Sequence, residues 1–419
     1  MAMTEYFDAE SVADSTKSNK GKEVRLESDT ESIKQSTSSN KGKEIRKESD
    51  TDTESIAKST SALGLSNQKS NEGKDKGKPL VIAIIGAGRC AHRHYLPAIE
   101  FARGDFYLDA VYSRSKASAT KLAASSKVYA PRAYWDEEPS RNLDVLLARD
   151  DIQAVVVLMH PSVQSSIIKK ALEAGKHVLS EKPVAQSSKS QRELEQWYNT
   201  RQWATQPRIW NVSENLMYFD TAHYAFEQLF LLGGPITSFC LRFYGIQMPV
   251  ASEGYELLTR FALRLIAILR YLLSAYQERV TNVTAFTSLL RQELPPQDTV
   301  HAIMKLNSGG SGTFTISLGS DFQNELEIAI YTAEGAVVVN PGRVVVKSKT
   351  MDHGDGEYKP EEKLLKGGSF VRRDVVAFAE AILKGYSTPS AKSDRGLGDL
   401  QIWETLLESA QRGESLYIA

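Results

Sequence analysis

The chain has 419 residues, 41% of them hydrophobic, and a formal net charge of -1, which predicts about two globular domains with sizeable cores. This near-neutral charge argues against nucleic acid or an anionic membrane surface as a partner, and it favours a small molecule. The two cysteines are too few for a disulfide framework, residues 1–10 lack the apolar core of a signal peptide, and no apolar run is long enough to cross a bilayer. We therefore expect a cytoplasmic protein without a membrane segment.

Residues 1–78 differ in composition from the rest of the chain. They are rich in Ser, Lys, Glu, Asp and Asn, and the segment SNKGKEVR at 18–25 recurs as SNKGKEIR at 39–46. Such a segment buries too little apolar surface to offset the entropy of ordering, so we predict a disordered tail. Two interpretations of the repeat stay open: a neutral spacer, or a regulatory segment phosphorylated at Ser28 and Ser49, which each precede acidic residues.

The first predicted element of the folded body is a buried strand over residues 80–85, a continuous apolar run that is rich in β-branched residues. A G-x-G-x-x-A turn follows at once, and then a helical stretch through residue 102. Strand, turn and helix in this order predict a dinucleotide site with the pyrophosphate at the helix N-terminus. The residues assigned to this loop are Gly86, Gly88, Arg89, Cys90 and Ala91.

The next predicted strand covers residues 107–112 and is followed by Ser113, Arg114 and Lys116, which we assign to the cofactor site. An NAD-specific enzyme usually places a carboxylate there to bind the ribose hydroxyls, and none follows this strand. A guanidinium offers two parallel donors to a 2′-phosphate. The pattern therefore favours NADP(H) over NAD(H), although Arg114 could also be a solvated loop residue.

Further along, we predict a buried strand over 153–158, a helix over 162–174 and a short strand over 176–180 that leads into Glu181-Lys182-Pro183. The segment ALEAGKHVLSEKP at 171–183 resembles the signature of the glucose-fructose oxidoreductase, inositol dehydrogenase and rhizopine-catabolism (Gfo/Idh/MocA) family. This resemblance extends over residues 79–419. It implies a Rossmann oxidoreductase that binds a nicotinamide dinucleotide.

The resemblance also implies the architecture. We expect an α/β Rossmann domain over 79–205 and an α+β domain over 206–419, with a large, mainly antiparallel open sheet. Alternating strand patterns over 236–346 indicate the same sheet independently. Amphipathic stretches over 370–383 and 399–410 predict helices that dock back onto the body. Such sheets often form homodimers or tetramers, but a monomer is equally allowed by the pattern.

In the family that this chain resembles, the lysine of Glu-Lys-Pro lies near the nicotinamide and the substrate. Lys182 is therefore the principal catalytic candidate, because an ammonium can protonate or polarise the reacting oxygen. Glu181, His160 and Pro161 are expected to line the cofactor. Tyr218 is a second candidate proton donor.

One departure from the family pattern falls in the predicted helix over 257–273. Polyol-oxidising members carry an Asp and a His for proton transfer there, but the matching positions hold Arg260, Ala262, Arg264 and Ala267. A guanidinium stays protonated and cannot act as a general base. Arg260, Arg264 and Tyr255 are instead expected to contact an anionic or oxygen-rich substrate, although the arginines could equally be solvated or pair with acids.

The leading hypothesis is therefore an NADP(H)-dependent reductase acting on a carbonyl, enone or imine of a small molecule. The alternative is a family member repurposed as a non-redox enzyme, a cofactor-sensing regulator or a partner-binding protein. Since no His or Cys cluster has metal-ligand spacing, no metal is expected.

Overall fold

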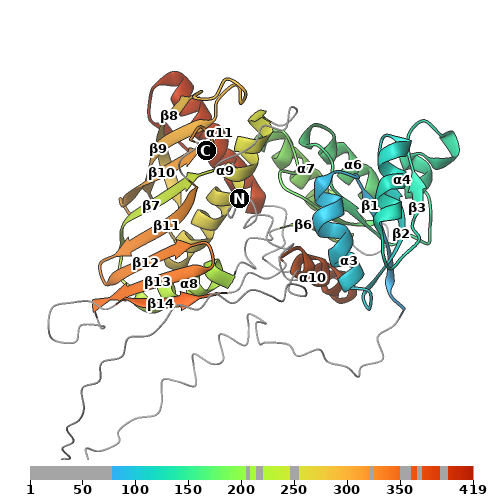
Figure 1. Cartoon of the computed structure of the whole chain (residues 1–419), viewed down its shortest axis with the longest axis horizontal. Coiled ribbons are helices and arrows are strands. Elements are labelled where there is room, and N and C mark those ends of the chain that lie inside the picture. The colour runs from blue at the N-terminus through green and yellow to red at the C-terminus, as the bar shows by residue number, and fades with distance from the viewer. Residues whose placement is uncertain are drawn as a thin grey trace, which may run out of the picture. The chain divides into compact units, whose positions relative to one another are not determined.

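The computed structural model describes residues 78–203, 208–213, 220–245, 254–320, 324–349, 360–365, 370–386 and 395–418, with only the backbone at 254–256, 370 and 395. The predicted disordered tail, except for its last residue, and the candidate Tyr218 lie outside these residues. Figure 1 shows the arrangement of the elements.

The first sheet has six parallel strands in the order β3-β2-β1-β4-β5-β6. This is the doubly wound order, in which the strands are added in opposite directions on the two sides of β1 and β4, and ligands bind at that point beyond the carboxyl ends of the strands. The strands are β1 (Leu80–Ile85), β2 (Phe106–Tyr112), β3 (Arg132–Tyr134), β4 (Ala154–Val157), β5 (His177–Ser180) and β6 (Trp210–Val212).

Helices cover both faces of this sheet, which explains why β1 and β4 are apolar throughout. One cluster of buried side chains joins the helix after β1 to α10, where the rings of Phe106 and Phe378 stack 6.0 Å apart. The other cluster lies under α6 and α7. The helices are α3 (Leu96–Phe101), α4 (Lys116–Ser125), α5 (Leu143–Leu147), α6 (Pro161–Glu173), α7 (Ser188–Thr200) and α10 (Phe370–Lys384).

The second sheet has nine strands in the order β14-β13-β12-β11-β7-β10-β9-β8-β15. All neighbours are antiparallel except β7 and β10. The strands are β7 (Ile236–Tyr244), β8 (Val280–Ser288), β9 (Thr299–Leu306), β10 (Ser311–Ser317), β11 (Glu325–Thr332), β12 (Gly335–Asn340), β13 (Arg343–Ser348), β14 (Glu361–Leu364) and β15 (Leu416–Tyr417).

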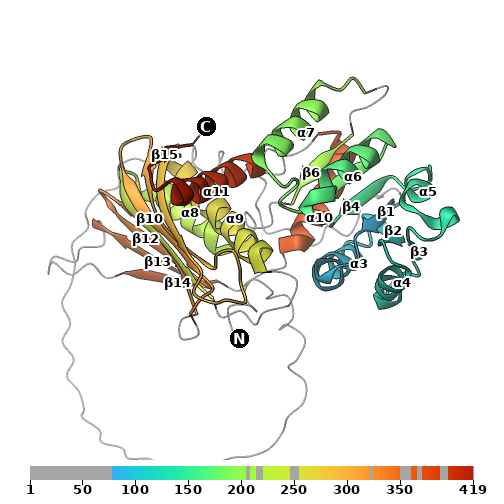
Figure 2. The ribbon, with the colours of Figure 1, turned by 90° about the horizontal axis from the view of Figure 1, so that it is seen from above.

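Three helices pack on one face of the second sheet, α8 (Asp220–Leu232), α9 (Gly254–Leu273) and α11 (Arg395–Arg412), as Figure 2 shows from above. Burial alternates along the strands, and β9 reads buried and exposed in turn from Val300 to Leu306. This alternation is typical of a sheet with one face in the core. The same core takes in the apolar side of α9 and α11, including Leu265 and Trp403.

The fold class predicted from the sequence is confirmed, with a parallel Rossmann sheet followed by a large, mostly antiparallel sheet. Most predicted elements agree with the structure within about two residues, but α11 begins at Arg395 rather than at 399. Two elements after residue 205, β6 and α10, belong to the parallel sheet and its covering layer. The division of the chain at 205/206 stays a prediction.

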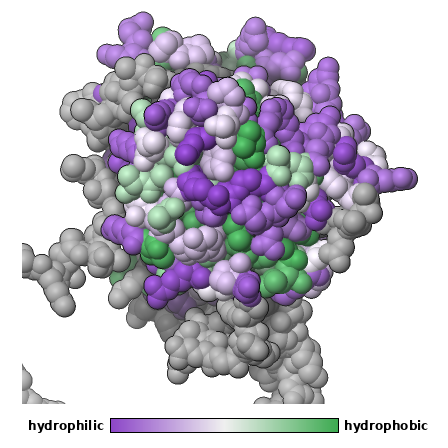
Figure 3. Space-filling view, turned by 90° about the vertical axis from the view of Figure 1, so that its right-hand side faces the viewer, coloured by the Kyte–Doolittle hydropathy of each residue, from purple (hydrophilic) through white to green (hydrophobic). Residues whose placement is uncertain are grey.

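The outer surface of the Rossmann half is predominantly hydrophilic in the view of Figure 3, with small apolar patches between the polar side chains. Among the helices that the structure describes, none is long and apolar enough to cross a membrane.

Candidate functional site

The loop after β1 has the geometry that a dinucleotide requires. Gly86 has φ +110°, and a Cβ there would lie 2.3 Å from the carbonyl oxygen of Leu158. A Cβ on Gly88 would meet nothing within 4 Å, because the backbone there borders open space. Only glycine fits the first position, and the second lets a ligand approach the backbone closely. The residues of this loop therefore fit a bound pyrophosphate.

The helix that follows the loop contains a π-helical segment, Ala91–Tyr95, a feature that often marks functional sites. This segment turns Tyr95 into the core, and its hydroxyl donates to Glu181 Oε1 at 3.0 Å. Burial, and then the Glu181 carboxylate, raise the pKa of Tyr95 well above its ordinary value, so the phenol remains a donor. The glycine-loop helix is thereby joined to the Glu-Lys-Pro segment.

The Glu-Lys-Pro segment follows β5 at the carboxyl edge of the sheet. Glu181 Oε2 accepts from the Lys182 backbone N–H at 3.0 Å, and Cys90 Sγ lies 3.9 Å from Glu181 Oε1. The Lys182–Pro183 peptide bond is cis. The buried Gln164 side chain donates to the carbonyl oxygens of Glu181 at 2.6 Å and Pro183 at 2.9 Å. The backbone on both sides of Lys182 is therefore held in place.

Gln164 also connects this segment to the loop after β4, because its Oε1 accepts from the Met159 N–H at 3.0 Å. The neighbouring His160 is the N-cap residue of α6, and its Nδ1 accepts from the Ser162 N–H at 3.2 Å. Pro161 occupies the first helical position, where its missing N–H costs nothing. The loops after β1, β4 and β5 thus share one edge of the sheet.

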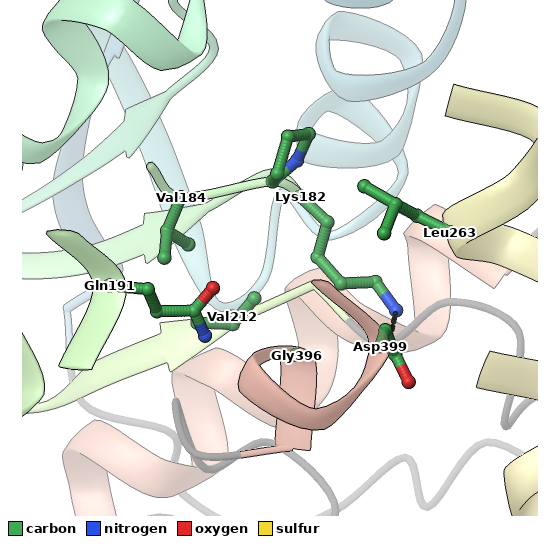
Figure 4. Close-up of a pocket in the computed structure, with 8 residues that line it drawn as sticks. Lys182, Val184, Gln191, Val212, Leu263, Gly396 and Asp399 are labelled. Atoms are coloured by element: carbon green, nitrogen blue, oxygen red, sulfur yellow. Dashed lines mark hydrogen bonds and ion pairs between the residues drawn. The ribbon is translucent and has the colours of Figure 1, made fainter. Parts of the chain in front are cut away.

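Lys182 follows β5, and its side chain extends toward α11, where its ammonium contacts the Asp399 carboxylate. Its Nζ lies 3.4 Å from Asp399 Oδ2, and the two side chains are 9% and 3% exposed. Asp399 Oδ1 also accepts from Arg270 Nη1 of α9 at 2.5 Å. A nearly buried carboxylate is therefore shared by two cations, and Figure 4 shows the lysine and the aspartate in contact.

A small pocket surrounds this contact, lined by side chains from both halves of the described chain. Leu263 of α9 closes one side of the pocket and Val212 of β6 another (Figure 4). The lining residues are Lys182, Pro183, Val184, Gln191, Val212, Leu263, Gly396 and Asp399. The Lys182 ammonium is accordingly enclosed among apolar groups with a carboxylate beside it.

Helix α9 presents Arg260 and Arg264 four residues apart, and therefore along one side of the helix. Arg260 is exposed and Arg264 is half-buried, while Leu263 between them lines the Lys182 pocket. Residues 257–273 of this helix contain no carboxylate and no imidazole. Tyr255 lies in its first turn, where only the backbone is described.

At the end of β2, Arg114 and Lys116 are exposed and Ser113 is half-buried. The Lys116 Nζ lies 5.3 Å from the ring centre of Trp135. Asp136, from the loop after β3, accepts from the Tyr112 hydroxyl at 2.7 Å. A carboxylate thus lies at this edge even though none follows β2 directly, because the neighbouring strand supplies it.

The described residues bring together the glycine loop, Glu181 and Lys182, as the sequence predicted. Sequence reasoning missed six side chains at the site: Tyr95, Asp136, Gln164, Leu263, Arg270 and Asp399. The residue types alone do not reveal them, because tyrosine and leucine are common in any core and glutamine and aspartate are common on any surface. The spacing does not reveal them either, since Lys182 and Asp399 are 217 positions apart.

The doubly wound sheet, its glycine loop and the lysine at its carboxyl edge define a class, that of the nicotinamide-dinucleotide oxidoreductases. Residues 80–204 match the model of the Gfo/Idh/MocA family, described as an oxidoreductase family with an NAD-binding Rossmann fold. A relative from Fusarium mangiferae, dehydrogenase FPY6, is 37% identical over 346 residues, covering 78% of this chain and 96% of the relative. The chain belongs to this family and is an oxidoreductase.

Two further comparisons extend this result. A dTDP-3,4-didehydro-2,6-dideoxy-alpha-D-glucose 3-reductase from Saccharopolyspora spinosa is 39% identical over 108 residues, covering 26% of this chain and 29% of the reductase. An oxidoreductase from Thermotoga maritima superposes with a TM-score of 0.69 at 18% identity, covering 81% of this chain and 98% of that structure. The second likeness shows that the fold is shared across both halves.

Proposed function

We propose that this chain reduces a carbonyl, enone or imine of a small molecule with NADP(H), and that Lys182 donates the proton. The observation that carries the proposal is an enclosed lysine at the carboxyl edge that lies beside Leu263 of helix α9, a helix with no carboxylate or imidazole over residues 257–273. An ammonium can give up a proton to a reacting oxygen or nitrogen. A guanidinium cannot, because it stays protonated.

The other polar residues of α9 then have a different task. Arg260 and Arg264 are suited to hold an anionic or oxygen-rich substrate, or to stabilise negative charge on the reacting oxygen. Tyr255 would add a contact at the start of the same helix. Tyr218 is the second candidate proton donor, and it would act if Lys182 only polarises the substrate.

The nicotinamide cofactor supplies the hydride when it is bound. The backbone of Gly86, Gly88, Arg89, Cys90 and Ala91 would hold its pyrophosphate. His160, Pro161 and Glu181 would line its nicotinamide end, because they lie at the carboxyl edge beside the reversal point of the sheet.

We propose NADP(H) rather than NAD(H) because Arg114 and Lys116 provide two exposed cations at the end of β2, with the Ser113 hydroxyl beside them. Asp136 is the opposing feature, since a carboxylate at this edge could bind ribose hydroxyls instead. Its hydrogen bond with the Tyr112 hydroxyl engages one of its oxygens with the protein. The two cations therefore outweigh the single carboxylate.

The reductive direction is supported by the similarity of part of the chain to a sugar 3-reductase. We further propose that the protein acts in the cytoplasm on a small molecule, as the sequence composition suggests. The open sheet would allow a homodimer or a tetramer.

The test combines binding with turnover. Fluorescence titration of the full chain with NADPH and NADH, repeated on Arg114→Ala, measures the cofactor preference. Incubation with NADPH and a panel of carbonyl, enone and imine compounds, followed by loss of absorbance, measures reduction. We expect NADPH to bind more tightly than NADH and at least one compound to be reduced. Binding without consumption of NADPH on any compound would instead favour a repurposed family member.

A further inference from the structure

The first turn of α11 carries two glycines on the N-terminal side of Asp399, and both lie close to cationic side chains. A Cβ on Gly398 would lie 2.4 Å from Arg270 Nη2 and 2.6 Å from Arg270 Cζ. A Cβ on Gly396 would lie 3.5 Å from Lys182 Cδ and 3.4 Å from Gln191 Nε2. At Gly396 a Cβ would make ordinary van der Waals contacts, whereas at Gly398 it would displace the Arg270 guanidinium, so the close approach of Arg270 to α11 depends on the glycine at position 398.

Asp399 occupies the point between these two cations. One of its oxygens is 3.4 Å from Lys182 Nζ and the other is 2.5 Å from Arg270 Nη1. The Asp399 side chain is 3% exposed, the Lys182 side chain 9% and the Arg270 side chain 35%. The ion pair of Asp399 with Lys182 is therefore less accessible to water than the pair with Arg270. Charge interactions are strong where water is excluded, and an adjacent carboxylate favours the charged form of a lysine.

We infer that Asp399 is the positioning residue of the site, which keeps the Lys182 ammonium charged and directed between α9 and α11, while Arg270 competes for the same carboxylate. This inference deepens the proposed function and rests on it for its catalytic meaning. The carboxylate would allow Lys182 to remain a proton donor in an apolar pocket. Arg270 would limit how tightly the carboxylate holds the lysine.

Other charged groups face Lys182 from the elements packed against it. Glu181 precedes it in the segment that follows β5, but its two oxygens accept hydrogen bonds from the Tyr95 hydroxyl and the Lys182 backbone N–H. From α7, Gln191 lines the pocket and donates to the buried Glu195 at 2.9 Å, which places that carboxylate behind the amide. Within the described part of the chain, Asp399 contacts Lys182 Nζ directly.

The experiment measures the titration of Lys182 itself. The full chain is trace-labelled with acetic anhydride over a range of pH, and the labelling of each lysine is quantified by peptide mass spectrometry. Only the neutral amine reacts, so the midpoint reports the pKa of that lysine. Lys170, which is exposed and pairs with Asp144 at 3.1 Å, serves as the internal reference in each digest.

With Asp399→Asn, we expect the Lys182 midpoint to fall by about one to two pH units, which is roughly ten- to a hundredfold faster labelling at a fixed lower pH. With Arg270→Gln, the Lys182 midpoint should rise, because the Asp399 carboxylate then no longer pairs with a second cation. Asp399→Glu should restore most of the wild-type value. A general loss of structure would not shift Lys182 in opposite directions in the two variants.

Glu404→Gln is the matched control. It also neutralises a carboxylate of α11, but Glu404 accepts from the Ser188 backbone N–H at 2.8 Å and lies away from the Lys182 pocket. The Lys182 midpoint should not change in this variant. Circular dichroism checks that each variant folds, and Arg270→Gln alone still decides the question if Asp399→Asn does not fold.

An unchanged or raised Lys182 midpoint in Asp399→Asn would overturn the inference, as would a lowered midpoint in Arg270→Gln. The readout needs no substrate, so it is separate from the test of the proposed function. If the midpoints shift as expected but Lys182→Ala keeps full turnover, the positioning stands and the catalytic role of Lys182 falls.

Discussion

The two sides of Lys182 are built in different ways. On the proposed cofactor side, the glycine loop, the residues around His160 and the Glu-Lys-Pro segment each follow a strand of one parallel sheet, and hydrogen bonds join them. On the substrate side, Leu263, Arg270 and Asp399 come from two helices that pack on a second sheet. The cofactor side is recognisable from local motifs, whereas the substrate side depends on how distant segments pack.

This difference has a functional meaning. A parallel sheet fixes the cofactor edge by its topology, so the same chemistry can be kept while the helices beyond it change. In this chain α9 carries Arg260 and Arg264, and its residues 257–273 contain no carboxylate and no imidazole. The predictions below test each side of the comparison.

The largest effect is expected where the two sides meet. Lys182→Ala should lower kcat for NADPH-dependent reduction by about 10²- to 10⁴-fold, because the proton donor is removed. The Kd for NADPH should change far less, since the pyrophosphate contacts come from the glycine loop. Steady-state kinetics and fluorescence titration measure the two quantities. Retention of kcat within about twofold would exclude Lys182 as the donor.

Substituting the two glycines of the loop after β1 should have different effects on stability and on cofactor binding. Gly86→Ala should lower the free energy of unfolding by at least about 2 kcal/mol, because of its φ of +110° and the Leu158 carbonyl at 2.3 Å. Gly88→Ala should alter stability by less than about 0.5 kcal/mol, since a Cβ there meets nothing, yet weaken NADPH binding by roughly tenfold or more. Denaturant titration and cofactor titration distinguish the two. Equal stability of the two variants would contradict the geometry of the loop.

The cofactor preference is a smaller effect. Arg114→Ala should raise the Kd for NADPH by about 10- to 100-fold and leave that for NADH nearly unchanged, because a charge-assisted hydrogen bond to the 2′-phosphate is lost. Asp136→Asn is the companion variant, and it should strengthen NADPH binding slightly by removing a negative charge. A ratio of the Kd values for NADH and NADPH that is the same in Arg114→Ala as in the wild type would leave the arginine without a selective role.

The smallest expected effect is on the pH dependence of stability, and it concerns His177 at the start of β5. Burial, and then the nearby Arg208 guanidinium, lower the pKa of His177 to about 4, and its Nδ1 accepts from the Ile209 N–H at 3.0 Å. The folded pKa lies below the unfolded value of about 6.5, so this stabilisation is complete above pH 6.5 and is lost as the pH falls toward 4. His177→Gln should flatten the dependence of Tm on pH in this window by an amount equivalent to about 1–2 kcal/mol. An identical pH profile in the variant would show that His177 does not contribute.

Most of the fold could be predicted from the sequence, because β1, its glycine turn and the Glu-Lys-Pro segment are local and each has a geometric reason. Asp399 could not, since it looks like any acid near the start of an amphipathic helix, and its partners Lys182 and Arg270 lie far away in the chain. Asp136 was missed for a similar reason, because it reaches the end of β2 from the loop after β3. The predictions for Tyr218 and for the tail fall on parts of the chain that the structure does not describe.

The most direct test of the central claim follows the hydride itself. The full chain is incubated with NADPH that carries deuterium at both C4 positions of the dihydronicotinamide, together with a compound that the panel shows to be consumed, and the product is analysed by mass spectrometry. Our account predicts a product one deuterium heavier, formed at a rate that Lys182→Ala reduces. Consumption of the compound without deuterium in the product, or with NADPH left unoxidised, would contradict it.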